Sequence, residues 1–525
     1  MKAWRRADRQ SSAVASTGFA SRGGSVTRTM PLSRWLVPLL VATAFVHGVS
    51  TAFVRPMFQV SDEMVYFAVA QAHAVRQAAT PDEVARLVGG SPGPIDEWVG
   101  AKPLYGRMAG AAYGLVATQT DPASALVLLR LWGCLALVLT VWLGHLVARE
   151  LCPTNPLVTW GTPLVMALHP VFVATGSGIT PDTWANAASA ASVLLLLRAV
   201  AGRAAWWEVA LLYATLTLAI ATKDTAYALV ASVAVALPGR AWLVWRGHRL
   251  RPADGLLFAG PLVGALAFTV PALRASLATF YFSPAAREQL VGAPFAFARD
   301  LVTTTVKQAP DYFQSFWGEL GNFGATPIGL PSHVLVALAI VCAAALAGAA
   351  AWFVAGSAWQ PAATLTTTRV QGVVIAAGCL ALLMLAPSRQ LLWDAADAVQ
   401  GRWLFPMLAP LVAVGLAGLS WPMGQPVRLL PVVSLLAATL ALGALLGGLL
   451  PAYYANYPTT YRPEHLFLAG SYGSGLDMAR ILPFFERPEW LRDPWVAWPP
   501  VVGLAIAVAA WLAIVHRMAT APTPR

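Results

Sequence analysis

Long apolar runs recur along the whole chain and are separated by short polar segments. Each run is about 20 residues long, which is the length a helix needs to cross the hydrocarbon core of a bilayer. The runs lie near 35–54, 124–147, 157–176, 183–201, 255–275, 333–355, 369–387, 403–420, 429–450 and 498–516. A further stretch, 206–237, is too long for one span, and Lys223-Asp224 interrupts it, so it predicts two short helices with a polar turn. The pattern therefore predicts an all-α polytopic membrane protein with about twelve transmembrane helices.

Basic residues are concentrated in alternate loops, which predicts an orientation. Short loops that carry arginine face the cytosol in most membrane proteins. By this rule the cytosolic segments contain Arg149, Arg203, the run Arg240 to Arg251, Arg369, Arg428 and Arg517. The opposite loops, 55–123, 276–332, 388–402 and 451–497, are longer and mix acidic with aromatic residues. An even number of spans then places both termini in the cytosol.

Composition supports a membrane protein and excludes several other classes. The chain is 58% hydrophobic and 11% charged, against roughly 25% charged in a soluble domain. Its net charge of +11 follows from the loop arginines, so it does not indicate nucleic acid binding. The four cysteines show no metal-binding or disulfide pattern. The predicted domains are a disordered basic cytosolic tail (1–34), a transmembrane bundle with its outer loops (35–516) and a short cytosolic tail (517–525).

The first polar segment after the first span contains the adjacent carboxylates Asp62 and Glu63. Ionised groups at the edge of a membrane are costly unless they are paired or face water, so they are often functional. They also open a large outer loop. The spacing of apolar residues from Asp62 to Ala74 is typical of an amphipathic helix that lies along the membrane interface.

Further polar groups follow at the ends of other spans on the same predicted side. They are Asp182, Lys223, Arg389, Asp394, Asp397, Gln400 and Arg402. Transfer of a sugar from a lipid phosphate needs a carboxylate to deprotonate the acceptor hydroxyl. It also needs cations to stabilise the leaving phosphate. On this hypothesis Asp62 is the base with Glu63 beside it, Asp182 orients the acceptor or assists a metal, and Lys223, Arg389 and Arg402 bind the phosphate.

Structural roles are alternatives for the same residues. Asp182 follows a proline and could cap a helix, Lys223 and Asp224 could neutralise each other, and Arg402 could anchor the chain at the interface. His169 is more typical of a packed histidine than of a ligand. Of the many aromatic residues in the outer loops, most fit an interfacial belt. A few are candidates for lining a substrate, and with Gln400 they are Tyr105, Trp317 and Trp403.

Several segments together resemble the GT-C superfamily of membrane glycosyltransferases, and more narrowly a poorly characterised group of bacterial predicted membrane proteins allied to it. The segments are Ser61-Asp62-Glu63, Lys102-Pro103-Leu104-Tyr105, Ile179-Thr180-Pro181-Asp182 and Thr222-Lys223-Asp224-Thr225, followed by the two most specific ones, residues 314–321 and 399–406. Their order agrees over about residues 35–450. Relatives often have a histidine soon after the acidic pair, whereas this chain has Met64 to Phe67.

The resemblance implies a bundle with a large first outer loop, a polyprenyl-phosphate sugar donor and an acidic residue of that loop, here Asp62, as base. It implies a glycosyltransferase of the bacterial inner membrane that acts at the extracytoplasmic face on a cell-envelope glycan, lipid or protein acceptor. No cofactor is indicated with certainty, and a divalent metal, if used, would bind Asp62 and Asp182. The alternatives are a transporter or lipid flippase, and a polymerase or ligase of envelope polysaccharide.

Overall fold

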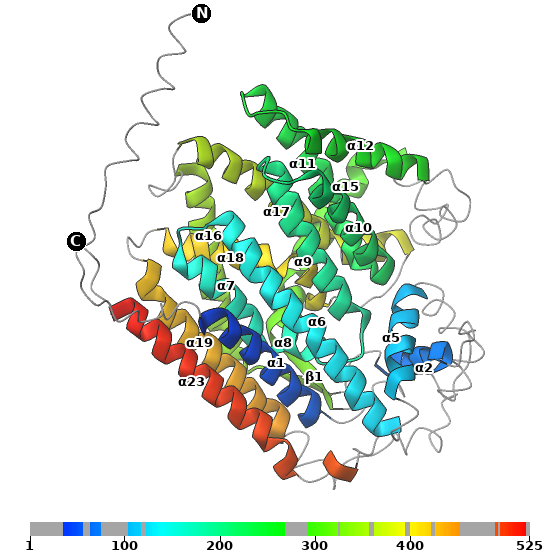
Figure 1. Cartoon of the computed structure of the whole chain (residues 1–525), viewed down its shortest axis with the longest axis vertical. Coiled ribbons are helices and arrows are strands. Elements are labelled where there is room, and N and C mark those ends of the chain that lie inside the picture. The colour runs from blue at the N-terminus through cyan, green and yellow to red at the C-terminus, as the bar shows by residue number, and fades with distance from the viewer. Residues whose placement is uncertain are drawn as a thin grey trace, which may run out of the picture. The chain divides into compact units, whose positions relative to one another are not determined.

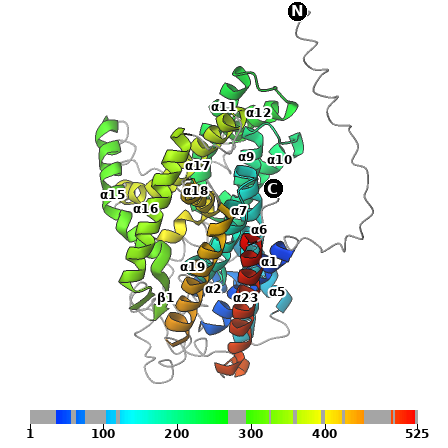
Figure 2. The same ribbon diagram turned by 90° about the vertical axis from the view of Figure 1, so that its left-hand side faces the viewer.

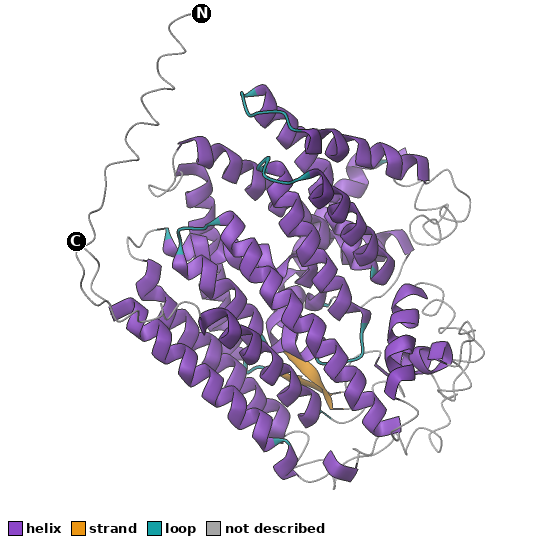
Figure 3. Cartoon of the chain, viewed as in Figure 1, coloured by secondary structure: helices purple, strands orange, loops and turns teal. Residues whose placement is uncertain are grey.

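The computed structural model describes residues 35–55, 63–74, 103–116, 122–267, 292–323, 326–355, 362–393, 400–421, 426–451, 489–491 and 494–520. These segments are almost entirely helical, with one short β-hairpin (Figure 3). The predicted N-terminal tail, 1–34, lies outside the described residues, as do Asp62, Asp394, Asp397 and most of the expected outer loops. The predicted C-terminal tail, 517–525, is helical as far as Thr520, and the rest of it lies outside the described residues.

Helices dominate both halves of the described chain. The first half contains α1 (Leu36–Val54), α2 (Glu63–Ala74), α5 (Pro103–Val116), α6 (Pro122–Leu151), α7 (Pro156–Leu168), α8 (Pro170–Gly176), α9 (Pro181–Val200), α10 (Trp206–Thr222), η3 (Asp224–Tyr227), α11 (Ala228–Trp245) and α12 (Pro252–Ala267). The second half contains α15 (Pro294–Gly318), β1 (Glu319–Phe323), β2 (Thr326–Gly329), α16 (Ser332–Ala355), α17 (Ala362–Trp393), η4 (Gly401–Met407), α18 (Leu408–Ser420), η5 (Pro426–Arg428), α19 (Leu429–Gly443), η6 (Ala444–Leu449), η9 (Glu489–Leu491), η10 (Pro494–Val496) and α23 (Trp498–Thr520).

Nine helices within the described part are long and apolar enough to span a membrane, or ten if α7 and α8 form one bent span. The prediction of a polytopic α-helical membrane protein is therefore confirmed, whereas the count of about twelve is not. Two predicted spans, which are too short in the described part of the structure, account for much of the difference between about twelve predicted and nine observed candidate spans. Helix α10 has 17 residues, and the described part of α12 has 16. The predicted split of 206–237 is confirmed, because η3 separates α10 from α11.

The helices pack around α9, which is the most buried of the candidate spans, while α16 is the least buried. Helices α6, α10 and α11 lie against α9. On the other side of α6, helix α1 packs against α23, and α23 also contacts α19, as Figure 1 shows. The perpendicular view shows α15 beside α16 (Figure 2), and residue contacts between the two confirm this neighbourhood. A central helix of this kind can bring its polar ends to several neighbours at once.

The predicted span 157–176 is broken at His169 into α7 and α8, which meet at 62°. Pro170 begins α8 and cannot donate a backbone hydrogen bond to the preceding turn, so the α7 helix ends at Leu168. The His169 side chain compensates by accepting a hydrogen bond from the Phe172 amide at 3.2 Å. The predicted span is therefore bent at this position, and proline chemistry explains the break.

Helix α2 occurs where the amphipathic helix was predicted, but it is not exposed along one face. Successive residues Val65, Tyr66, Phe67 and Ala68 are all buried. The helix packs against α5, which covers side chains that would otherwise face solvent or lipid headgroups. The expected interfacial helix is thus a packed element of the protein.

Strands β1 and β2 form an antiparallel hairpin, which the sequence pattern did not predict. Glu319 lies opposite Gly329, and Phe323 lies opposite Thr326. The hairpin contacts η6, a short π-helix that follows α19. Glu319 and Leu320 are thereby fixed at the end of α15, two and three residues after the predicted substrate-lining residue Trp317.

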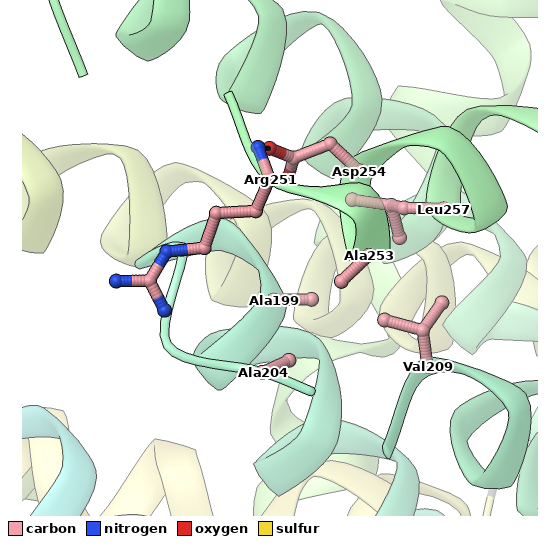
Figure 4. Close-up of a pocket in the computed structure, with 8 residues that line it drawn as sticks. Ala199, Ala204, Val209, Arg251, Ala253, Asp254 and Leu257 are labelled. Carbon is pink, nitrogen blue, oxygen red and sulfur yellow. Dashed lines mark hydrogen bonds between the residues drawn. The ribbon is translucent and has the colours of Figure 1, made fainter. Parts of the chain in front are cut away.

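The arginine-rich ends of α9, α11 and α12 are joined by a buried ion pair. Arg240 donates to Asp254 through Nε at 2.8 Å and Nη2 at 2.9 Å, and both residues are almost fully buried. The guanidinium lies against Gly202, whose φ of +67° ends α9 in the left-handed conformation. A small hollow beside this pair, lined by Arg251 and Leu257 among others (Figure 4), is too narrow for a water molecule. This region therefore has a structural role.

Candidate functional site

Five segments that are far apart in the sequence meet at the end of the bundle opposite the Arg240–Asp254 pair. We call this end the convergent end. They are the residues after α1, the α8–α9 turn, the α10–η3 turn, the end of α15 with β1, and the start of η4. Direct contacts join them: Glu63 to Ile179, Arg55 to Ala174 and Leu320, Asp182 to Lys223 and Arg402, and Ser315 to Gly401. The convergence expected from the sequence is therefore present for the described residues.

Asp182 is the centre of a buried charge cluster. Its Oδ1 lies 3.5 Å from Lys223 Nζ, and its Oδ2 lies 3.8 Å from Arg402 Nη1. Asp182 is 2% exposed, and the side chains of Lys223 and Arg402 are 8% and 11% exposed. Charges so far from water are costly unless they are paired. Two cations around one carboxylate therefore form an arrangement that a bound anion would stabilise further.

The local structure explains how Asp182 comes to face these cations. Thr180, and not Asp182, is the N-cap of α9: its hydroxyl accepts from the Asp182 amide at 3.3 Å. The same hydroxyl donates to Asp182 Oδ2 at 2.8 Å. With Pro181 at the first helical position, Asp182 lies in the first turn, where the helix dipole favours a negative charge. The helix-capping role suggested for Asp182 thus belongs to Thr180, and the Thr180 hydroxyl orients the Asp182 carboxylate.

Lys223 and Arg402 come from two other breaks in helical structure. Lys223 ends α10 and precedes η3, and it pairs with Asp182, whereas Asp224 accepts from the Thr225 amide at 3.1 Å. Arg402 lies in η4, where its Nε donates to Gln400 Oε1 at 2.8 Å. Gln400 therefore orients Arg402 toward the cluster. The arginine faces a buried carboxylate and does not simply reach the membrane surface.

The segment 400–402 is held tightly against the end of α15. The Gly401 amide donates to Ser315 Oγ at 2.7 Å. A Cβ at position 401 would lie 2.1 Å from the Phe316 amide nitrogen and 2.3 Å from its Cα, which is impossible without a backbone shift. The two sequence segments with the most specific resemblance, 314–321 and 399–406, thus pack directly on each other. Only glycine permits this approach.

Glu319 adds a second carboxylate beside Arg402. Although it retains solvent contact, desolvation by the surrounding chain raises the pKa of Glu319, and the positive charge of Arg402 opposes this rise. Its protonation state therefore affects the net charge around Arg402. The sequence analysis did not single out Glu319 as a site residue. It lies within the segment 314–321, but nothing in the local pattern distinguishes it from other acidic residues in the loops.

Glu63, predicted to accompany the base, is engaged in a buried ion pair with Arg130. Arg130 Nε and Nη2 donate to the two Glu63 oxygens at 2.8 and 2.6 Å, and the Ile179 amide donates to Glu63 Oε1 at 3.2 Å. Arg130 Nη1 also donates to the carbonyls of Ala52 and Arg55. Glu63 therefore fixes the chain after α1 against α6 and the turn before α9.

Arg130 was not predicted from the sequence, although a signal was present. An arginine inside an apolar span needs a buried partner, and Glu63 was a nearby candidate once the span and the first loop were placed. Asp62 itself, the predicted base, lies outside the described residues. It immediately precedes Glu63, which lies at the convergent end.

Tyr105, predicted to line a substrate, lies buried between aromatic rings. Its ring centroid is 5.4 Å from Tyr66 and 6.2 Å from Trp132, and Trp132 is 5.0 Å from Trp184. Burial raises the pKa of Tyr105 well above its usual value, and the neighbouring Tyr66, Glu63 and Asp182 raise it further. The hydroxyl therefore stays protonated at neutral pH and remains a hydrogen-bond donor near the charge cluster.

The two predicted tryptophans contact other side chains of the protein. Trp317 stacks on His169 with a centroid distance of 4.5 Å, and Phe316 meets the same imidazole edge to face. Trp403 is buried in a small apolar cluster with Tyr312. His169 is a packed histidine, as expected, although its buried Nε2 has no hydrogen-bond partner among the described residues.

Two further predictions concern Arg389 and a metal. Arg389 lies in α17, but its side chain is outside the described part. As for a metal, the described residues contain no group of three or more His, Cys, Asp or Glu side chains that could hold one. Asp62, which was expected to share a metal with Asp182, lies outside those residues.

A comparison with models of known protein families gives a match. A profile of the family described as "Predicted membrane protein (DUF2142)" matches residues 104–412, more than half of the chain. The matched region contains Asp182, Lys223 and Arg402. No curated protein matches the sequence.

Proposed function

This chain belongs to the family of predicted membrane proteins described as DUF2142, and we propose that it is a glycosyltransferase that uses a polyprenyl-phosphate sugar. The donor would bind at the convergent end. The acceptor would be a cell-envelope glycan, lipid or protein at the extracytoplasmic face of a bacterial inner membrane. The resemblance to the GT-C superfamily described above supports the same proposal.

The observation that carries the proposal is the cluster of Asp182, Lys223 and Arg402. Two cations from separate helical breaks approach one buried carboxylate at the end of a membrane-spanning bundle. A lipid phosphate lies at the same depth in a bilayer as the ends of the spanning helices. Arg402 can contact phosphate oxygens in a bidentate manner, and Lys223 supplies a compact charge.

The reaction uses these charges in a simple way. The acceptor oxygen forms a bond to the anomeric carbon while the bond from that carbon to the phosphate oxygen breaks, with inversion. The acceptor proton moves to a carboxylate base, and the electron pair of the broken bond remains on the polyprenyl phosphate. Lys223 and Arg402 stabilise this growing negative charge, an effect that is typically worth about 10²–10³ in rate for one donor.

The carboxylates have different roles in this scheme. Asp62 is the proposed base, since it adjoins Glu63 in the sequence and Glu63 lies at the convergent end. Glu63 is a positioning residue. Asp182 holds Lys223 and Arg402 in place before the donor arrives, so that the two cations are preorganised.

The test is transfer of labelled sugar by the purified protein in nanodiscs. A panel of undecaprenyl- and decaprenyl-phosphate sugars serves as donor, with an envelope extract as acceptor. Lys223→Met and Arg402→Met should each lower transfer at least a hundredfold, and Asp62→Asn should abolish it. Arg299→Met is the matched control, because Arg299 is an exposed cation on α15 whose ion pair is with the adjacent Asp300.

The outcome separates the roles clearly. Full transfer by the Asp62→Asn protein would remove the base assignment, and full transfer by both cation variants would remove the phosphate site. If the wild-type protein transfers no sugar from any donor in the panel and binds no polyprenyl phosphate, the proposal itself fails.

A transporter or lipid flippase is the second candidate, and one observation favours it. The α7–α8 break leaves His169 Nε2 buried without a partner among the described residues, and broken helices with buried polar groups form the binding sites of many transporters. Proton-coupled flux of a polyprenyl-phosphate sugar across proteoliposomes without any acceptor would support this candidate. Flux that persists in the His169→Phe protein would exclude His169 from the transport pathway, and absence of flux in the wild type would contradict the candidate.

A further inference from the structure

An aromatic ladder leads from α2 to α9 beside the charge cluster. We use this name for Tyr66, Tyr105, Trp132 and Trp184, which come from α2, α5, α6 and α9 in that order. Adjacent rings have centroid distances of 5.4, 6.2 and 5.0 Å. The last member, Trp184, follows Asp182 by two residues in the first turn of α9. The ladder therefore ends at the segment that holds the buried carboxylate.

The two tryptophans of the ladder are not buried completely. Tyr66 and Tyr105 are 2% and 1% exposed and form its base. Trp132 and Trp184 keep part of their surface accessible, and their rings are tilted by 37° from each other. Packing of α6 fixes Trp132, since a Cβ on the adjacent Gly133 would lie 3.0 Å from the carbonyl oxygens of Gly176 and Gly178. The two indoles are therefore held in place, and part of the surface of each remains accessible.

Trp184 also has an unused hydrogen-bond donor. Its Nε1 is buried and has no partner among the described residues, whereas a buried indole N–H normally finds one. Leaving such a donor unpaired costs free energy, and an acceptor atom of a bound molecule would recover it. Buried donors without partners call for such an explanation.

The chemistry of the ladder fits a sugar ring. The face of an indole is electron-rich and attracts the polarised C–H groups of a pyranose or furanose ring, and its edge donates to a hydroxyl. Binding sites for small polar molecules typically combine such aromatic walls with a few oriented polar groups. Here the polar groups are Trp184 Nε1 and Asp182, whose charge acts on Tyr105 in the ladder. A prenyl chain bound at this position would leave the indole N–H without an acceptor.

We propose that Trp184, with Trp132 beside it, forms the subsite for the sugar ring of the donor, with Trp184 Nε1 donating to a sugar hydroxyl. This inference rests on the proposed function for the phosphate site and adds the group that recognises the sugar. Trp132 contributes its ring face, and the ring of Tyr105 packs against Trp132.

The test compares lipids with and without a sugar. The full-length protein in nanodiscs is titrated with undecaprenyl phosphate and with its glucose, mannose and arabinose conjugates, and affinities are measured by microscale thermophoresis. For the wild type, the best conjugate should bind at least tenfold more tightly than undecaprenyl phosphate. Trp184→Phe keeps an aromatic ring but removes the donor, so the preference should fall about fivefold. Trp184→Leu should abolish the preference.

In both variants the affinity for undecaprenyl phosphate should stay unchanged. Trp207→Phe is the control for the substitution itself, because Trp207 is 54% exposed on α10 and its removal should alter neither affinity. Thermal unfolding of each protein shows whether the fold is intact. Trp132→Leu provides a second variant if Trp184→Leu fails to fold.

Three results would overturn the inference. A sugar preference that is unchanged in Trp184→Phe and Trp184→Leu would exclude the ladder from sugar recognition. An equal loss of affinity for all four lipids would assign the ladder to the prenyl chain. No preference in the wild type would exclude the subsite while leaving the phosphate site intact, whereas no binding of any lipid would refute the proposed function as well.

Discussion

Glu63 and Arg130 are 67 residues apart in the sequence and form a buried, bidentate ion pair. Both side chains are at most 1% exposed. The pair joins the chain that follows α1 to the first turns of α6, and the Ile179 amide adds the turn before α9. Two segments of the convergent end are thus fixed to α6 through one carboxylate.

Removal of one partner should be far more harmful than removal of both. Glu63→Gln leaves the Arg130 charge buried without its counter-ion, and a broken buried pair typically costs about 3–5 kcal/mol. The double variant Glu63→Leu/Arg130→Met should recover most of this stability, because neither charge remains. Thermal unfolding in detergent measures both effects. Equal unfolding temperatures for Glu63→Gln and wild type would contradict the structural role of the pair.

Gly401→Ala should displace Arg402 from Asp182. The new methyl group would overlap the Phe316 backbone, so the segment 400–402 must move away from α15. Under the proposed function, transfer should fall at least a hundredfold, with a smaller loss of stability. Gly443→Ala is the matched control, since a Cβ at Gly443 meets no atom within 4 Å. Normal transfer by Gly401→Ala would show that the approach to Phe316 is not required.

At the arginine-rich end, Gly202→Ala should destabilise the protein by more than the backbone strain alone. An L-residue at φ +67° costs roughly 1–2 kcal/mol, and the new Cβ would also lie 2.7 Å from the Arg240 guanidinium. Gly255→Ala in α12 is the control, because its Cβ would enter open space and alanine favours a helix by about 0.5–1 kcal/mol. The unfolding temperatures of the two variants should therefore shift in opposite directions.

Binding of a polyprenyl-phosphate sugar should depend on pH through Glu319. The pKa of this carboxyl is raised, so it becomes neutral as the pH falls through that raised value, and Arg402 then has one fewer competing anion. The donor is a phosphate diester and keeps one negative charge throughout, so its affinity should rise as the pH is lowered. Glu319→Gln should bind tightly at every pH, whereas Asp300→Asn, an exposed control, should keep the wild-type profile.

The two ends of the bundle should react with labels from opposite sides of the membrane. Gln314 and Arg249 are exposed near the convergent end and the arginine-rich end, respectively. In a protein without its four cysteines, an impermeant maleimide should label Gln314→Cys in intact cells and Arg249→Cys only after permeabilisation. Labelling of both from one side would contradict the predicted orientation.

Much of the fold could be predicted from the sequence because a bilayer imposes simple rules. Apolar length identifies spans, and the interruption at Lys223-Asp224 correctly separates α10 from α11. The break at His169 was missed because the hydropathy of 157–176 is continuous, although Pro170 carried the signal. The hairpin at Glu319 was also missed, since its short strands are set by contacts with η6 rather than by their own pattern.

The candidate site was predicted in part, for similar reasons. Charges at span ends must meet partners, so the proximity of Asp182, Lys223 and Arg402 could be expected once those ends were assigned to one side. Pairings inside the bundle could not be derived in this way. Arg130 lies within an apolar run. Trp132 and Trp184 resemble ordinary interfacial aromatics until helix packing brings Trp132 beside Tyr105 and Trp184 beside Trp132.

The contact of Gly401 with Phe316 has a consequence for the affinity of any ligand that binds there. A loop that must become ordered on binding loses conformational entropy at that moment, and this loss weakens the complex. The segment 400–402 is already immobilised by the Ser315 hydrogen bond and by backbone contact with α15. A molecule that reaches Arg402 therefore meets a guanidinium whose freedom was lost during folding, and its affinity is not diminished by rearrangement of this segment.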